Sequence, residues 1–314
     1  MKRAAPISAA NEPGSRGPGL LAGSLKQQWK RYRKQLKRCQ HECSPRAIHA
    51  FRVETRRLVS TLELLSGFLP SRQMEKAQRI LKHHRDAFDE LRDTQVQLAA
   101  VGGMRRAFPA LSPFYACLRE REERLTRKTC KRLTEVRTGR LGKLIAGCRG
   151  EVEEQLTKCA PRRALAVLVR SVDRAFRRTR QLRGRIDASD TWTIHRTRVA
   201  FKKFRYMVEA LAEHLPGIAA ERLAALRQYQ TMMGEIQDSE VLLATLDKFL
   251  LRQEIKPGAA HRFRAELLRR RQRLIRVYLK AADQLLEFWP LPNSGAGVSP
   301  AQARREFEPK VSSV

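Results

Sequence analysis

Residues 48–65 read IHAFRVETRRLVSTLELL, and residues 194–211 read IHRTRVAFKKFRYMVEAL. The two stretches align without a gap, 146 positions apart, and Ile, His, Arg and Val recur at the same places. Apolar residues in both stretches are spaced three and four apart, which is typical of an amphipathic helix. Each stretch therefore predicts a helix, and their likeness indicates an internal repeat.

A second pair of segments follows at nearly the same interval. Residues 90–98 read ELRDTQVQL and residues 235–243 read EIQDSEVLL, which aligns Asp93 with Asp238. Because the matched segments occur in the same order, we interpret the chain as a duplication of one helical unit. We expect the two aspartates to hold neighbouring arginines in place rather than to perform catalysis.

Long segments rich in Leu, Ala, Arg, Glu and Gln lie between short steps that contain Pro or Gly, and strand signals are nearly absent. The predicted fold class is therefore all-α. We expect helices at 20–42, 46–67, 72–101, 113–138, 142–158, 162–184, 191–214, 218–252 and 259–288.

These helices form one expected domain with two repeats and two tails. The helical domain covers residues 20–289, with repeat one at about 20–158 and repeat two at about 161–289. Residues 1–19 and 290–314 are polar and contain Pro and Gly, so we expect disordered tails there.

The charge of the chain restricts its partners. Its 314 residues include 64 Lys and Arg against 32 Asp and Glu, a formal net charge of +32. Such a surplus favours a polyanionic partner, which could be nucleic acid, an anionic membrane surface or inorganic polyphosphate. Aromatic residues make up only 6% of the chain, and most have the spacing of core residues. The sequence therefore favours binding to phosphate groups over stacking on bases.

The basic residues of the repeated stretches fall on one side of each predicted helix. At about 100° per residue, His195, Arg198, Lys202 and Arg205 occupy a wedge of roughly 80°, opposite an apolar face. The first copy has the same arrangement around His49. Successive cations are spaced about 5 Å apart along the axis, which suits an extended chain of phosphates.

The cysteine pattern and the absence of an export signal in the sequence indicate an intracellular protein. All six cysteines lie between residues 39 and 159, and no secretory signal or run of 18 apolar residues is present. We expect reduced thiols and a cytoplasmic location. The segment CQHEC at 39–43 matches no common zinc spacing. The segment GRLGKL at 139–144 lacks the spacing, the Ser or Thr and the preceding strand of a phosphate loop.

These motifs resemble a known family. HAFRVETRRL and HRTRVAFKKFRY are similar to the HxxRVxx(R/K)(R/K)xR signature of the CHAD family, the conserved histidine α-helical domain. LRDTQV and IQDSEV resemble its later L(R/Q)D motif, and the resemblance covers about residues 20–289. It implies two antiparallel helical bundles related by pseudo-twofold symmetry, with basic helices lining a central cleft or pore. It also implies non-catalytic binding of inorganic polyphosphate, association with polyphosphate granules and no cofactor.

The resemblance also assigns residues to the expected site. They are His49, Arg52, Arg56 and Arg57 in the first motif and His195, Arg198, Lys202, Lys203 and Arg205 in the second. Arg124 and Arg273 are second-tier candidates from a looser alignment of REREERL with LRRRQRL. Val59 replaces the third basic residue of the first copy, so we expect the second copy to contribute more to binding. The ExExK motif of fused triphosphate-hydrolysing domains is absent, which indicates a stand-alone member.

Two other functions remain open. A nucleic-acid-binding protein would fit the charge, but it needs stacking or base-reading groups on the basic faces. We expect nucleic acid to be only a non-specific competitor. An adaptor that recruits an enzyme to granules would bind a protein partner and show little affinity for the polymer itself.

Overall fold

The computed structural model of the chain describes residues 17–212, 218–252 and 257–290. Every regular element in these ranges is a helix, which confirms the all-α prediction. The α-helices are α1 (Gly17–Glu42), α2 (Pro45–Ser66), α3 (Arg72–Asp86), α4 (Asp89–Met104), α5 (Ser112–Glu135), α6 (Gly139–Thr157), α7 (Pro161–Arg183), α8 (Thr191–Ala212), α9 (Ala220–Leu250) and α10 (Pro257–Ala281). Two 3₁₀-helices, η1 (Pro109–Leu111) and η2 (Ala282–Glu287), complete the set. Most of the expected tail residues lie outside the described ranges.

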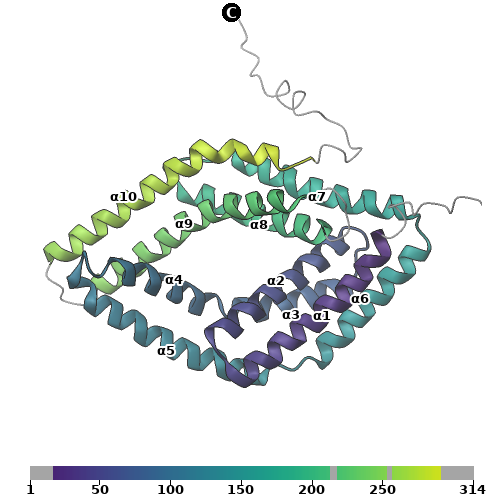
Figure 1. Cartoon of the computed structure of the whole chain (residues 1–314), viewed down its shortest axis with the longest axis horizontal. Coiled ribbons are helices and arrows are strands. Elements are labelled where there is room, and N and C mark those ends of the chain that lie inside the picture. Colours follow the sequence, from purple (N-terminus) through teal and green to yellow (C-terminus); the bar gives the residue numbers. More distant parts are fainter. Residues whose placement is uncertain (1–16, 213–217, 253–256, 291–314) are drawn as a thin grey trace, which may run out of the picture.

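The helices surround a central opening. Figure 1 shows α7 to α10 along one side of an elongated ring and α1 to α6 along the other. The two sides meet where α2 packs against α8 and where α4 packs against α9. The two helices that carry the repeated basic motif are therefore neighbours, and so are the two helices that carry the repeated aspartate.

Two hydrophobic cores hold the ring together, and each takes residues from both halves of the chain. The larger core contains Phe51 and Leu62 of α2 together with Phe201 and Phe204 of α8, all of them inaccessible to solvent. The smaller core joins α4, η1 and α5 to α9 and α10, around Phe114, Phe249 and other apolar side chains. Because both halves contribute to both cores, burial of apolar surface stabilises the contact between the halves directly.

The prediction of one helix over 72–101 is wrong, because the chain breaks between α3 and α4. The Phe88 side chain turns into the core, where its ring lies 5.5 Å from that of Phe51. Arg52 of α2 donates a hydrogen bond of 2.6 Å to the Phe88 carbonyl and one of 2.9 Å to Asp89. A side chain from another helix thus satisfies a carbonyl at the break.

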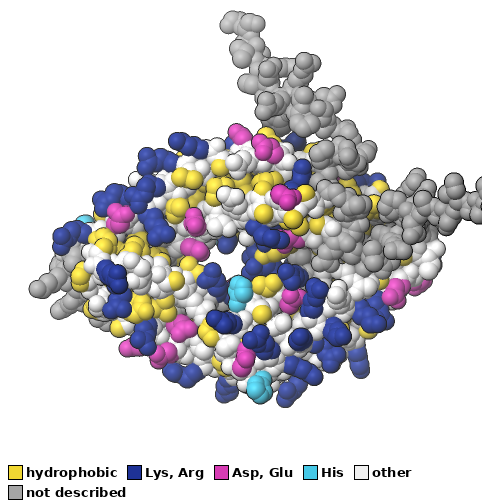
Figure 2. Space-filling view, viewed as in Figure 1, with side chains coloured by type: hydrophobic (Ala, Val, Ile, Leu, Met, Phe, Trp, Pro, Cys, Tyr) yellow, Lys and Arg dark blue, Asp and Glu magenta, His cyan; other side chains and the backbone are white. Residues whose placement is uncertain are grey.

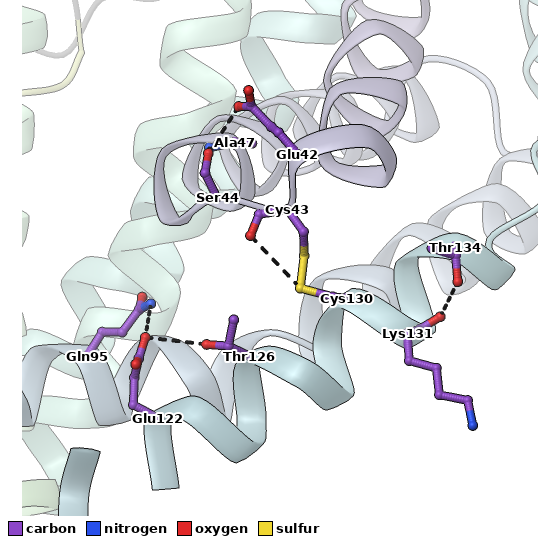
Figure 3. The surroundings of a disulfide bond; sticks show 10 residues. All are labelled: Glu42, Cys43, Ser44, Ala47, Gln95, Glu122, Thr126, Cys130, Lys131 and Thr134. Atoms are coloured by element: carbon purple, nitrogen blue, oxygen red, sulfur yellow. Dashed lines mark hydrogen bonds between the residues drawn. A yellow bond between two sulfur atoms is a disulfide. The ribbon is translucent and has the colours of Figure 1, made fainter. Parts of the chain in front are cut away.

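The expectation that all six cysteines are reduced is also wrong. Cys43, in the turn between α1 and α2, forms a disulfide with Cys130 of α5, and their Cα atoms are 5.8 Å apart (Figure 3). Cys43 has a φ of 38°, so the turn adopts a left-handed conformation at this residue. The partners are 87 residues apart, and only the tertiary packing brings them together. The other four cysteines carry free thiols.

No helix in the described ranges is long and apolar enough to cross a membrane. The described residues also contain no group of three or more His, Cys, Asp or Glu that could hold a metal ion.

Candidate anion-binding site

Helices α2 and α8 place the repeated basic motif at the contact between the two halves. Ser44 caps the N-terminus of α2, where its side chain accepts a hydrogen bond from the Ala47 amide, and Pro45 is the first helical residue. The apolar face of each helix enters the larger core. The basic face is therefore fixed on the other side, as the helical spacing predicts.

Lys202 lies at the centre of a group of cations from three helices. The charges of Arg56 on α2, Arg85 on α3 and Arg198 on α8 all act on its ammonium group. Burial, followed by these three positive charges, lowers the pKa of Lys202 to about 7, and only Asp89 opposes the change. We call Arg56, Arg85, Arg198 and Lys202 the central cationic cluster.

Two side chains of the central cationic cluster leave donor groups without a partner. The Nε atoms of Arg56 and Arg198 are buried and have no hydrogen-bond acceptor among the described residues. Arg56 donates from Nη1 to the Tyr206 hydroxyl at 2.7 Å, whereas no described residue pairs with Arg198 or Lys202. Native proteins rarely leave a buried donor unpaired unless water or an ion completes the site.

The two motif histidines have different surroundings. His195 is half-buried, and its Nδ1 shares a hydrogen bond of 2.5 Å with Gln237 of α9. Its ring also stacks on Trp192, with centroids 4.9 Å apart. His49 is exposed at the corresponding position of α2. The second copy therefore holds its histidine rigidly, while the first leaves it accessible.

Two of the predicted site arginines are buried and engaged in the protein itself. Arg52 pairs with Asp89 and the Phe88 carbonyl, and burial lowers its pKa. Arg205 pairs with Glu209 at 2.5 Å and with Gln230 at 2.7 Å. Their guanidinium groups brace α2 and α8 from within the protein.

The remaining predicted residues of the two motifs lie on the surface. Arg57 is exposed and pairs with Glu54 at 2.8 Å. Lys203 is exposed, with no partner among the described residues. Neither belongs to the central cationic cluster.

The two second-tier arginines are far less alike than their alignment suggests. Arg124 of α5 lines a cavity of about 920 Å³ that is formed by α4, α5 and α9. Arg273 of α10 is exposed and pairs with Glu266 at 3.0 Å, and it does not line this cavity. Of the two arginines, only Arg124 lines this cavity.

The repeated aspartates approach each other where α4 meets α9. Burial raises the pKa of Asp93, as do the carboxylates of Asp89 and Asp238. Burial also raises the pKa of Asp238, and the charges of Arg198 and Arg92 oppose this rise. The two arginines thus act on Asp238 through their charge. That the aspartates hold arginines in place stays a prediction.

Sequence reasoning missed three participants. Arg85 lies at the end of α3, outside both motifs, and it reaches Lys202 only through the packing of α3 on α2. Tyr206 and Gln237 were missed because each serves the site through one hydrogen bond to a motif residue. Tyr206 could have been noticed, since it lies four residues after Lys202 on the same helical face.

Figure 2 shows an opening through the centre of the molecule, with Lys, Arg and His side chains along part of its edge and a few acidic side chains elsewhere. The charges on this edge are accessible to solvent from the side that is shown. Such an arrangement can attract an anion and surround it with donors from several helices.

Comparisons with known proteins agree with this architecture. The family profile described as CHAD domain matches residues 23–247. The crystal structure of the CHAD domain from the plant Ricinus communis is similar, with a TM-score of 0.66 and 19% identity over 88% of this chain and 95% of that one. PptA from Streptomyces chartreusis is similar with a TM-score of 0.64 and 16% identity, over 86% of this chain and 99% of that one. No curated protein sequence matches the chain.

Proposed function

The chain belongs to the CHAD domain family, and from this premise we propose that it binds inorganic polyphosphate in its central opening. The central cationic cluster makes the main contacts. His49, Arg57, His195 and Lys203 extend the attractive surface on either side. Arg52 and Arg205 act by holding α2 and α8 in position.

The observation that carries the proposal concerns two members of the central cationic cluster, Arg198 and Lys202, since Arg85 pairs with Asp86 and Arg56 donates to Tyr206. Arg198 and Lys202 form no hydrogen bond or ion pair with the described residues. Burial, followed by the surrounding cations, lowers the pKa of Lys202 to about 7. Grouping like charges in a partly buried place costs free energy, and a bound anion would remove that cost. Phosphate oxygens suit the site because guanidinium groups meet them in pairs.

A polymer fits the site better than one small anion. The basic residues of α8 recur along its axis, and α2 adds Arg56 from the facing helix. Arg124 offers a further cation at the cavity between α4, α5 and α9. A chain of phosphates can contact several of these groups at once and release condensed counterions, which favours binding.

The proposal also covers how the fold arose and where in the cell the protein acts. We propose that the halves arose by duplication and that pseudo-twofold symmetry relates them, since α2 meets α8 and α4 meets α9. Non-catalytic binding in the cytoplasm, in association with polyphosphate granules and their enzymes, is part of the same proposal. It is supported by the family relationship.

A charge-reversed variant tests the proposal. Arg198→Glu with Lys202→Glu should lower the affinity for long-chain polyphosphate by at least tenfold, measured by calorimetry at fixed salt. The matched control is Arg276→Glu with Lys280→Glu, which has the same spacing and the same change in charge on the exposed surface of α10. The control should lose much less affinity. Equal affinities of both variants, confirmed as folded by circular dichroism, would contradict the proposal.

Competition separates polyphosphate binding from the two alternative functions. Unlabelled long-chain polyphosphate should displace a labelled polyphosphate at lower concentration than single-stranded RNA does, at equal phosphate content and salt. Stronger displacement by RNA would favour the nucleic-acid alternative. Absence of direct polyphosphate binding, together with capture of a granule enzyme, would favour the adaptor alternative.

A further inference from the structure

An exposed tryptophan lies next to the proposed site. Trp192, in the first turn of α8, has 62% of its surface accessible, whereas Trp289 is buried and Trp29 is half-buried. Its indole stacks on the His195 ring with the planes only 11° apart. One face of the indole therefore rests on a site residue, and much of the remaining surface is open to solvent.

Two hydrogen bonds hold the groups next to the indole: the Trp192 backbone and the His195 ring on which the indole stacks. The Trp192 amide donates to the Asp190 side chain at 3.0 Å, which anchors the start of α8. On the other side of the stack, Gln237 holds the His195 ring. A large aromatic surface that is held rigid at low entropic cost is well suited to a planar ligand.

The indole also lies at a suitable place relative to the unpaired cations. Arg198 and Lys202 follow Trp192 by six and ten residues, which at 1.5 Å per residue is about 9 and 15 Å along the helix axis. Trp192 is exposed, whereas Arg198 and Lys202 are half-buried. At 100° per residue the two cations lie about 120° and 80° around the helix from Trp192, and His195 lies between them and the indole. A ligand with a flat ring at one end and a row of phosphates at the other can contact all three.

We propose that this site also binds nucleoside polyphosphates, with a purine base stacked on the open face of Trp192 and the phosphates bound by Arg198 and Lys202. The inference rests on the proposed function, since it uses the same cations. Only the second half has this feature, because Arg46 occupies the aligned position, 146 residues earlier. The exposed indole also supplies the stacking group that the sequence did not reveal on the basic faces.

Calorimetry with ATP, UTP and tripolyphosphate tests the inference at fixed pH and salt. ATP and UTP carry the same phosphates, so the difference between them reports on the base. We expect ATP to bind more tightly than UTP, because a purine stacks over a larger area. Removing the indole with Trp192→Ala should weaken ATP binding about fivefold or more and leave tripolyphosphate binding unchanged.

Two further variants serve as controls. Trp192→Phe keeps an aromatic face and should retain part of the preference for ATP. Val277→Ala removes an exposed apolar side chain from α10 and should change nothing. ATP should also quench the tryptophan fluorescence of the unmodified protein, and this quenching should be lost in Trp192→Phe.

The outcomes distinguish this inference from the function on which it rests. Equal affinity for ATP and UTP, with no effect of Trp192→Ala, would overturn the nucleotide proposal while tripolyphosphate and long-chain polyphosphate still bind. Failure of every phosphate compound to bind would overturn both proposals. Loss of tripolyphosphate binding in Trp192→Ala would show a general effect on the site and would also contradict a specific stacking role.

Discussion

At the scale of single residues, a substitution of Lys202 should have opposite effects on the stability of the fold and on polyphosphate binding. Its pKa falls from 10.5 to about 7 in the folded protein, so folding disfavours its charged form. The destabilising contribution of Lys202 has its full size below pH 7, and it decreases to zero as the pH rises towards 10.5. We expect Lys202→Met to raise the Tm by about 2 °C or more at pH 6, with a smaller gain at pH 9.

Lys202→Met should also bind polyphosphate less tightly. A lysine with only a structural role would not lose binding when its replacement stabilises the fold. Differential scanning calorimetry at both pH values, together with a binding assay, provides the measurement. Lys280→Met is the control, because Lys280 is exposed on α10 and lies outside the proposed binding surface. A lower Tm for Lys202→Met at pH 6 would show that the ammonium group stabilises the fold, contrary to our interpretation.

The lowered pKa of Lys202 also makes binding sensitive to pH. Phosphate charges near Lys202 should raise its pKa, so the protein should take up a proton when polyphosphate binds. Affinity should therefore fall by up to about tenfold per unit as the pH rises above 7. Titrations at pH 6, 7, 8 and 9 would measure the slope. Lys202→Gln should bind more weakly at pH 6 and lose most of the slope, and an unchanged slope would assign the proton to another group.

Individual residues show how far the site could be predicted from the sequence. Helical spacing separates Arg198 and Lys202, which are half-buried, from the fully buried Phe201 and Phe204 of the same helix. The spacing could not show that Arg205 pairs with Gln230, because that partner lies on another helix. Arg85 was missed for the same reason. A single sequence gives the faces of its helices, and the contacts between helices depend on packing.

At the scale of elements, the break between α3 and α4 depends on Arg52. This guanidinium is buried and holds both the Phe88 carbonyl and the Asp89 carboxylate. Arg52→Met should reduce the free energy of unfolding by about 2 kcal/mol, because it removes two hydrogen bonds of the buried guanidinium and leaves the Phe88 carbonyl with only the Arg92 amide as donor. Chemical denaturation would measure the loss, and Arg276→Met, on the exposed surface of α10, serves as the control. Unchanged stability with lost polyphosphate binding would make Arg52 a direct ligand.

The disulfide between Cys43 and Cys130 is a second contact that connects distant elements. It ties α5 to the turn between α1 and α2 and closes a segment of 87 residues (Figure 3). Cys43→Ser with Cys130→Ser should lower the stability of the oxidised protein by about 2–4 kcal/mol. Cys117→Ser, which removes an exposed free thiol, should have little effect. Reducing the disulfide of the unmodified protein should abolish the difference in stability between it and the double serine variant. Equal stability of the two proteins in oxidising buffer would contradict a stabilising role of the disulfide.

These elements also show which parts of the fold the sequence could predict. Most helix ends were predicted within a few residues, because Pro, Gly and capping residues mark them locally, as Ser44 and Pro45 do for α2. The break at Phe88 lacks such a signal, since a buried ring and an arginine from α2 produce it. The disulfide likewise depends on a contact between distant segments. Local chemistry predicts the helices, and tertiary packing decides where they break and cross.

At the scale of the whole molecule, the net charge of +32 should give salt two opposite effects. Without ligand, salt screens the repulsion between cations, so the Tm should rise between 50 and 300 mM NaCl. Counterion release favours the polyphosphate complex most at low salt. The increase in Tm on adding polyphosphate should therefore become smaller as the salt concentration rises. Neutralisation of four phosphates would weaken binding about 50-fold between 50 and 200 mM salt. Thermal shift assays with and without polyphosphate test both effects. An increase in Tm that does not depend on salt would show that the net charge contributes little to binding.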